Sequence, residues 1–88
     1  MKMVETHHRL VVFNSVHRVM VAEQKLMDEF DILLVPVPAA ISTGCGMVLR
    51  ICATDEKRIA EILGAAGLQP FRIYAPEGDG YVEVGEFS

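Results

Sequence analysis

The sequence predicts a single α+β domain built of two layers, with a β-sheet in one layer and helices in the other. Its length of 88 residues is too short to fill two hydrophobic cores. Its composition is 51% hydrophobic and 23% charged, which is typical of globular proteins and far from that of disordered chains. Short β-rich runs alternate along the chain with segments of helical periodicity. We therefore expect residues 1–88 to form one mixed domain.

The first half of the chain contains two predicted strands and one predicted helix. Residues 10–13 form a β-rich run, and Ser15 follows at a position suited to cap a helix. Residues 16–30 carry apolar side chains at spacings of three, four and seven, which indicates an amphipathic helix. Residues 32–35 form the second strand, and Pro36 places that strand at a sheet edge because proline cannot donate to a central ladder. The apolar stripe of the helix consists of Val16, Val19, Met20, Leu26, Met27 and Phe30.

The second half repeats this order. Residues 47–52 form the third strand, and Thr54 or Asp55 caps a second helix. Gly67 ends this helix because glycine readily adopts the left-handed conformation of a C-terminal cap. Residues 70–75 form the fourth strand, and the alternation in residues 81–84 indicates a short fifth strand.

The element order βαββαβ is that of the ferredoxin-like sandwich, with an extra C-terminal strand as an option. In this fold two helices cover one face of an antiparallel sheet, and the other face is expected to be open. Residues 1–8 are expected to form a mobile N-terminus, and residues 77–88 either a C-terminal hairpin or a tail. The loop between the second and third strands should lie at the same end of the sheet as the start of the first helix.

The charge distribution bears on the partners. The net charge is −4 and the eight Lys and Arg residues are scattered, which argues against nucleic acid because phosphate binding needs a clustered basic surface. No segment approaches the ~18 apolar residues of a membrane span, and Met1 to Arg9 lack the apolar run of a signal peptide. We therefore expect a cytoplasmic protein with reduced thiols.

Cys45 is the residue most suited to chemistry. It lies in the loop between the second and third strands, between Gly44 and Gly46, and glycines leave room for a partner to approach the sulfur. The nearby helix start carries a partial positive charge, which lowers the pKa of a thiol and stabilises an anionic sulfur or selenium species. The residues expected to hold such an anion are Ser42, Thr43, Gly44, Gly46, Ser15 and His17.

One set of residues occurs at a spacing that is specific only in combination: Phe13, Ser15, Ala22, Glu23, Leu26, Val35 to Pro38, Ile41, Ser42, Cys45, Gly46, Leu49 and Arg50. On these residues the chain resembles the selenium/sulfur carrier protein-like family of small bacterial and archaeal domains. The resemblance spans about residues 11–50, with Ala39 where the family usually has a basic residue. It implies that Cys45 is the covalent site of a carrier, which takes sulfur or selenium from a donor enzyme and passes it to an acceptor synthase. No general base accompanies Cys45 at useful spacing, so we expect no catalytic turnover, and we expect no cofactor.

A second hypothesis is a small ligand-binding or regulatory module that acts as an oligomer. Arg50 should project from the open face of the sheet, because it alternates with Met47, Leu49 and Ile51. With Val48 it would form a docking or homodimer contact there, although a solvated arginine explains Arg50 equally well.

The other chemistry-bearing residues have plainer explanations. Cys52 is expected to be a small buried residue. A Cys45–Cys52 disulfide is excluded if 47–52 is a strand, because seven extended residues span about 23 Å and a disulfide needs Cα atoms within ~7 Å. His7 and His8 are assigned to the mobile terminus, and no metal site is expected.

Overall fold

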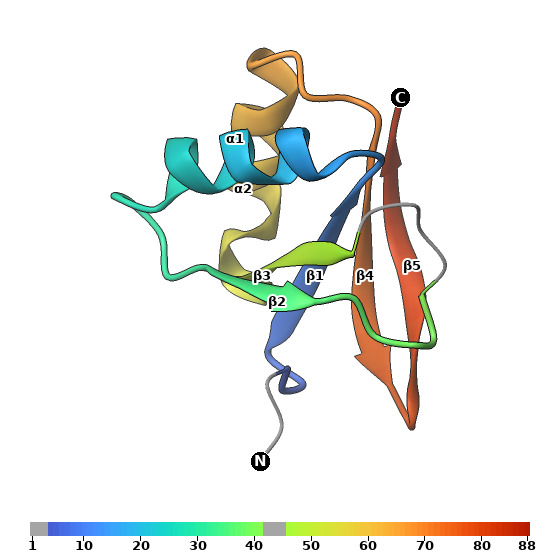
Figure 1. Ribbon diagram of the computed structural model, residues 1–88. Coiled ribbons are helices and arrows are strands. Elements are labelled where there is room, and N and C mark those ends of the chain that lie inside the picture. The colour runs from blue at the N-terminus through green and yellow to red at the C-terminus, as the bar shows by residue number, and fades with distance from the viewer. Residues whose placement is uncertain (1–3, 42–45) are drawn as a thin grey trace.

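Five strands and two α-helices make up the fold. Figure 1 presents a computed structural model, which describes residues 4–41 and 46–88. The elements in chain order are β1 (His8–Phe13), α1 (Val16–Leu26), β2 (Leu33–Pro36), β3 (Met47–Cys52), the 3₁₀ turn η1 (Ala53–Asp55), α2 (Glu56–Ala65), β4 (Phe71–Glu77) and β5 (Gly80–Phe87). Neither helix is long and apolar enough to cross a membrane, as far as the described residues go.

The strands form one antiparallel sheet in the order β2-β3-β1-β4-β5. The part β2-β3-β1-β4, with its two helices, confirms the predicted α+β class and is compatible with a ferredoxin-like sandwich. The last strand, β5, adds a further edge beside β4, and it is longer than the predicted run 81–84. Gly78 begins the tight turn between β4 and β5 with φ 58°, a conformation that glycine adopts without strain.

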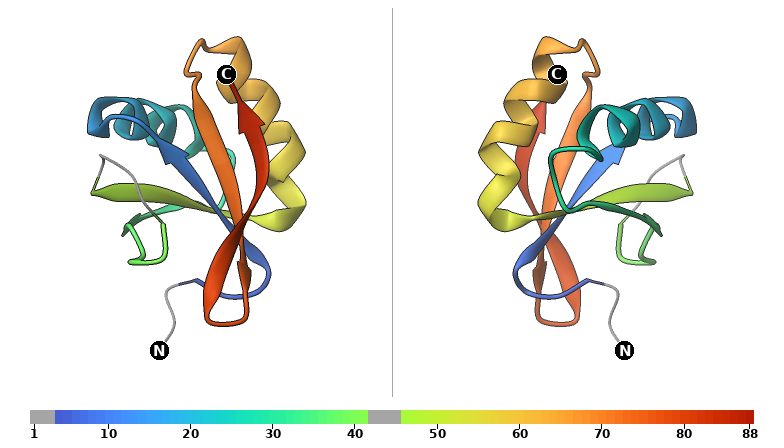
Figure 2. Two further views of the ribbon diagram at one scale, coloured as in Figure 1. Left: turned by 90° about the vertical axis from the view of Figure 1, so that its right-hand side faces the viewer. Right: turned by 90° about the vertical axis from the view of Figure 1, so that its left-hand side faces the viewer.

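Both helices pack on one face of the sheet, as predicted (Figures 1 and 2). The face of α1 that contacts the sheet differs from the predicted stripe, because Val19, Ala22 and Leu26 are buried whereas Met20 and Met27 are half exposed. The small Ala22 lets the helix approach the sheet closely, which turns the larger methionines toward solvent. The cluster between the layers is Val11, Phe13, Val19, Ala22, Leu26, Leu49, Ile51, Ile59, Leu63, Leu68, Phe71 and Ile73.

The opposite face of the sheet is not open, which corrects the sequence-based expectation. A second apolar cluster lies there, made of Leu10, Val12, Val35, Ile41 and Val48. The partly buried residues packed on it are Val4, Val37, Tyr74 and Tyr81. Segments without regular structure, together with a tyrosine from β5, therefore cover this face of the sheet, as the helices cover the other face. We call it the helix-free face.

The start of α1 and the end of α2 are tied together. Gly67 ends α2 with φ 72°, as predicted, and the Leu68 N–H donates to the Leu63 carbonyl at 3.1 Å. The Arg18 guanidinium, from the first turn of α1, donates to the Gln69 carbonyl at 2.9 Å. This contact holds the first turn of α1 against the segment that leads into β4.

Candidate functional site

The candidate site is the segment between β2 and β3, residues 37–46. In the antiparallel register Val11 pairs with Leu49 and Pro36 pairs with Met47. The end of β1, the end of β2 and the start of β3 therefore lie at one end of the sheet, and α1 starts there too (Figure 1). This placement of the loop relative to the helix start agrees with the sequence-based expectation.

Both ends of this segment are fixed to the sheet. The Val37 N–H donates to the Gly46 carbonyl at 3.0 Å, which continues the β2–β3 ladder by one step. The Ile41 N–H donates to the Pro38 carbonyl at 3.0 Å and closes a turn. The Ile41 side chain is only 5% exposed and belongs to the apolar cluster of the helix-free face. The loop thus leaves and rejoins the sheet at defined points.

Four of the predicted site residues lie outside the described residues: Ser42, Thr43, Gly44 and Cys45. Their direct neighbour Gly46 is described and exposed. A Cβ atom added to Gly46 would have no heavy atom within 4 Å, and the backbone there is not in the left-handed region. The fold itself therefore does not require glycine at position 46, and the space that a side chain would take there is open.

The predicted anion-binding residues of α1 lie at the same end of the sheet. Ser15 is the N-cap, and its hydroxyl oxygen accepts a hydrogen bond from the Arg18 N–H at 3.2 Å. His17 is exposed in the first turn. Within the part of the chain that the structure describes, no hydrogen bond joins Gly46 to Ser15 or His17. Ser15 thus serves the helix cap.

Arg50 projects from the helix-free face, as its alternation predicted, while Val48 is 0% exposed beneath the residues that cover this face. The expected docking contact through Val48 is therefore wrong, because the side chain has no surface to offer. Arg50 is partly exposed and lies near His8 at mid-sheet.

His8 belongs to the fold, although it falls within the segment expected to be mobile. It is the first residue of β1, is buried, and its Nδ1 accepts a hydrogen bond from the Glu5 N–H at 2.9 Å. Burial, and then the Arg50 guanidinium, lower the pKa of His8 below its ordinary value of 6.5. The neutral imidazole is thus the form that the fold favours.

This depressed pKa predicts a pH dependence of stability. An unfolded histidine titrates near ~6.5, so below that pH the unfolded chain binds more protons at this site than the folded chain. The contribution of His8 to the free energy of unfolding is therefore complete above about pH 6.5 and falls as the pH drops toward the folded pKa. We expect a larger loss of stability from pH 7.5 to 5.5, measured by urea unfolding, in the wild type than in His8→Gln. Equal losses in both proteins would contradict this assignment.

Cys52 is partly exposed, contrary to the expectation of a buried residue. It ends the interior strand β3, and its thiol lies 3.9 Å from the Asp31 carbonyl oxygen, to which it donates. The position at the strand end gives solvent access that the apolar neighbours in the sequence did not indicate. The reactivity of Cys45 must therefore be measured against that of Cys52, whose thiol solvent can reach.

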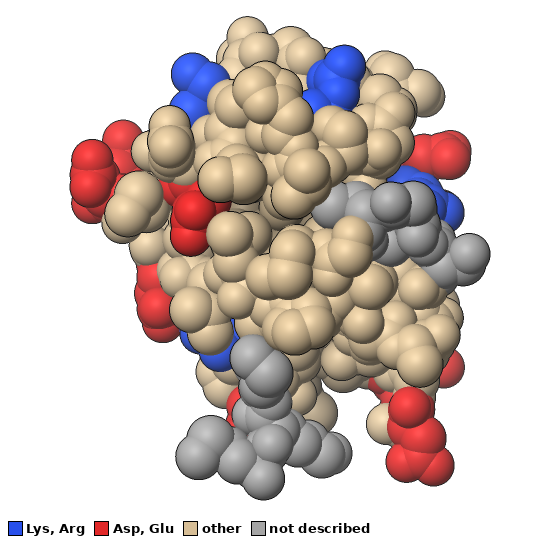
Figure 3. Space-filling view, in the orientation of Figure 1, with Lys and Arg blue, Asp and Glu red and all other residues tan. Residues whose placement is uncertain are grey.

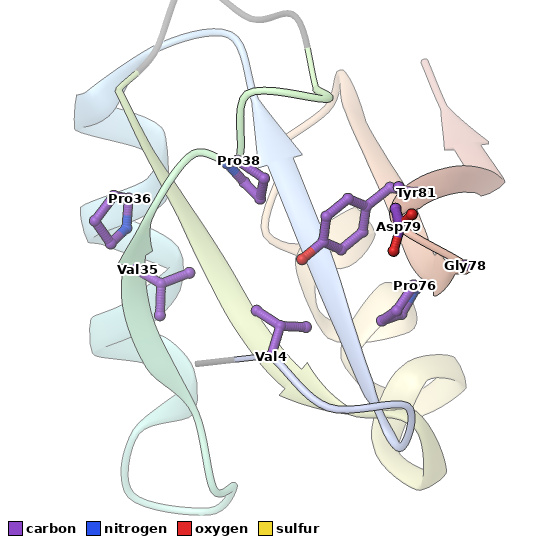
Figure 4. Close-up of a pocket in the computed structure, with 9 residues that line it drawn as sticks. Val4, Val35, Pro36, Pro38, Pro76, Gly78, Asp79 and Tyr81 are labelled. Atoms are coloured by element: carbon purple, nitrogen blue, oxygen red, sulfur yellow. The ribbon is translucent and has the colours of Figure 1, made fainter. Parts of the chain in front are cut away.

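A hollow beside the loop was not found from the sequence. It has a volume of about 370 Å³ and is lined by Val4, Val35, Pro36, Pro38, Pro76, Gly78, Asp79, Gly80 and Tyr81 (Figure 4). Its two walls come from segments about 40 residues apart in the sequence, so no local pattern could indicate it. No group of three metal-ligating side chains occurs among residues 4–41 and 46–88.

Comparison with known proteins identifies the family of this chain. The family model described as "Putative Se/S carrier protein-like" matches residues 8–75, from the first residue of β1 into β4. The chain belongs to this family, which confirms the resemblance found from the sequence. The matched range includes Cys45 and stops before β5. No curated protein and no solved structure matches the chain.

Proposed function

We propose that the protein carries sulfur or selenium as a covalent adduct on Cys45. The observation that supports this role most strongly is the family match, which spans the whole loop and the strands that flank it. The described ends of the loop fit the role, because Ile41 anchors one side in the sheet cluster and Gly46 leaves open space on the other. A carrier thiol needs this combination of a fixed support and access for two partners.

The transfer step is an exchange between sulfur atoms. The Cys45 thiolate attacks the terminal sulfur of a persulfide on the donor enzyme, a new S–S bond forms, and the donor's own S–S bond breaks. The proton on the terminal sulfur moves with it, and the donor cysteine leaves as a thiolate. The exchange is redox-neutral and needs no further reactant. Delivery repeats the exchange with the acceptor synthase, whose thiolate attacks the terminal sulfur on Cys45 and releases the Cys45 thiolate. If the cargo is selenium, a selenium atom replaces the terminal sulfur in each step.

In this proposal the protein is a substrate of its partners and not itself an enzyme. Its partners are a donor whose cysteine holds a persulfide, or the corresponding adduct with selenium as the terminal atom, and a synthase that receives that terminal atom. The role places the protein in the cytoplasm, where thiols stay reduced. Self-association through an open sheet face is not part of the proposal, since the helix-free face is occupied by the chain's own residues.

Intact-mass measurement tests the proposal directly. The purified protein is incubated with a cysteine desulfurase and cysteine, and the expected product is heavier by about 32 Da, the mass of one sulfur atom, with the added mass removed by dithiothreitol. The same protein incubated with the desulfurase but without cysteine is the control. Absence of the adduct with desulfurases of several classes would contradict the carrier role.

Gly46→Ala should slow the transfer of sulfur to Cys45 without lowering the stability of the fold. We expect an unchanged or higher free energy of unfolding, by up to about 1 kcal/mol, because the backbone at Gly46 is compatible with alanine and the added Cβ meets no atom. We expect slower loading of Cys45 by a protein donor, since the methyl group fills space beside the thiol. Urea unfolding and the rate of mass increase give the two quantities. Loading at the wild-type rate would show that the open space at Gly46 does not serve the donor.

A further inference from the structure

The hollow beside the loop lies between two parts of the sheet. The sheet is strongly twisted, so that β4 and β5 cross the direction of β2 and β3 (Figure 2). This twist separates the end of β2 from the β4–β5 hairpin on the helix-free face. Tyr81 extends from the hairpin toward Val4, Val35 and Pro38 on the other side (Figure 4). The result is a hollow of about 370 Å³ over the apolar cluster.

The lining is apolar with an acidic margin. Among the residues that the structure describes, valine and proline side chains make most of the wall, Tyr81 and Asp79 supply its polar side chains, and no Lys or Arg lines it. A smaller hollow of about 110 Å³ shares Val4, Pro76 and Gly78 with it and adds Glu5. Acidic side chains also stand at the tip of the β4–β5 hairpin (Figure 3), where Glu77 and Asp79 are exposed.

The carboxylates at this margin are available to a partner. The ion pairs of the described residues join Arg9 to Glu56, Arg58 to Glu29 and Arg72 to Glu83. Among these residues neither Glu5 nor Asp79 takes part in an ion pair. Unpaired carboxylates around an apolar floor attract a ligand that is apolar and positively charged, and the net charge of −4 adds to this attraction at long range.

The hollow also adjoins the Cys45 loop. Pro36 and Pro38, on its wall, stand at the beginning of the loop, and the Pro38 carbonyl accepts the hydrogen bond that fixes Ile41. A partner seated in the hollow therefore contacts the base of the loop directly. A volume near the lower end of the ~300–1,000 Å³ range of ligand sites holds a few side chains and not a whole helix.

From this geometry we propose that the hollow is a docking site for an extended, apolar segment carrying Lys or Arg on the protein that delivers sulfur or selenium to Cys45. The inference rests on the proposed function for the identity of that partner. Apolar side chains of the segment fill the space between Val35 and Tyr81, and its cationic groups pair with Asp79 and Glu5. The hairpin wall of the site lies beyond the family match, which ends at residue 75, whereas the opposite wall, with Val35 and Pro38, lies within it.

Binding is tested with peptides and the ¹⁵N-labelled full chain. The probe is a nine-residue peptide of alternating Val and Lys, and a peptide of alternating Val and Glu is its matched control. We expect the Lys peptide to shift amide signals of Val4, Val35 and Gly78 to Tyr81, and the Glu peptide to shift none.

In Asp79→Lys the affinity for the Lys peptide should fall by about tenfold or more, or about 1.4 kcal/mol, while Glu61→Lys on the far side of α2 should retain it. Absent shifts, equal shifts with both peptides, or equal losses in the two variants would overturn the proposal.

A transfer experiment separates this site from the carrier role itself. Asp79→Lys should be loaded more slowly than the wild type by a protein donor, and at the wild-type rate by inorganic polysulfide, which needs no docking. Slower loading by both donors would contradict a docking role for Asp79. Failure of the wild type to load from either donor would contradict the proposed function, whereas the peptide measurements stand independently of the thiol.

Discussion

The Cys45→Ser variant is expected to take up no sulfur from a donor that loads the wild-type protein. The hydroxyl of serine cannot form a persulfide, so the acceptor atom is lost. The fold should survive, because the neighbouring anchors are the Val37–Gly46 hydrogen bond and the buried Ile41, and neither involves the thiol. Intact-mass measurement after loading should give complete loss of the adduct, and circular dichroism should give an unchanged melting temperature.

Cys52→Ser is the matched control for this variant. Its side chain undergoes the same change, and Cys52 is partly exposed, so a non-specific reagent would reach it too. We expect Cys52→Ser to load as fully as the wild type. Equal loading of Cys45→Ser and wild type would remove Cys45 from the proposed function and direct attention to the thiol beside the Asp31 carbonyl.

Val48→Lys is expected to destabilise the fold strongly. Val48 is 0% exposed within the cluster that Ile41 and Val35 complete on the helix-free face. An ammonium group there would lose its hydration without a partner built to receive it, which we expect to cost about 4 kcal/mol or more. Small domains have a total free energy of unfolding of about 5–15 kcal/mol, so this loss removes a large part of it. Thermal unfolding should register it as a fall in melting temperature of roughly 15 °C or more.

Val84→Lys provides the comparison, since it makes the same change in a strand at a side chain that is 47% exposed. We expect its melting temperature to lie within about 4 °C of the wild type, which corresponds to less than 1 kcal/mol. Similar melting temperatures for the two variants would mean that the helix-free face is open in solution. The open-face docking surface predicted from the sequence would then have to be reconsidered.

The regular elements were largely predictable because their signals are local. The mostly apolar run of residues 47–52 predicted β3 with its observed bounds, and Gly67 marked the end of α2. The buried face of α1 was not predictable by counting large apolar residues, since the close contact with the sheet is made by the small Ala22. The cover of the helix-free face was missed because Val4 and Ile41 reach it from segments without periodicity.

The candidate site also has a part that the sequence predicts and a part that it does not. Its reactive residue and its loop follow from the order of residues along the chain, in which glycines flank Cys45 between two strands. The support of the loop does not, because it depends on the packing of Ile41 in a cluster that includes Leu10 and Val12 of the distant strand β1. The neighbouring hollow requires the twist of the sheet, which brings Tyr81 opposite Pro38. Contacts of this kind depend on the tertiary structure and produce no periodic pattern in the sequence.

Peptide mapping of the loaded wild-type protein tests the central claim most directly. Trypsin cleaves after Lys25, Arg50 and Lys57, so Cys45 and Cys52 fall in separate peptides, 26–50 and 51–57. After incubation with a cysteine desulfurase and cysteine, and alkylation to trap the persulfide, the extra mass of about 32 Da should be found in peptide 26–50 and be absent from peptide 51–57. An adduct confined to peptide 51–57, or divided equally between the two peptides, would contradict the assignment of Cys45 as the carrier site.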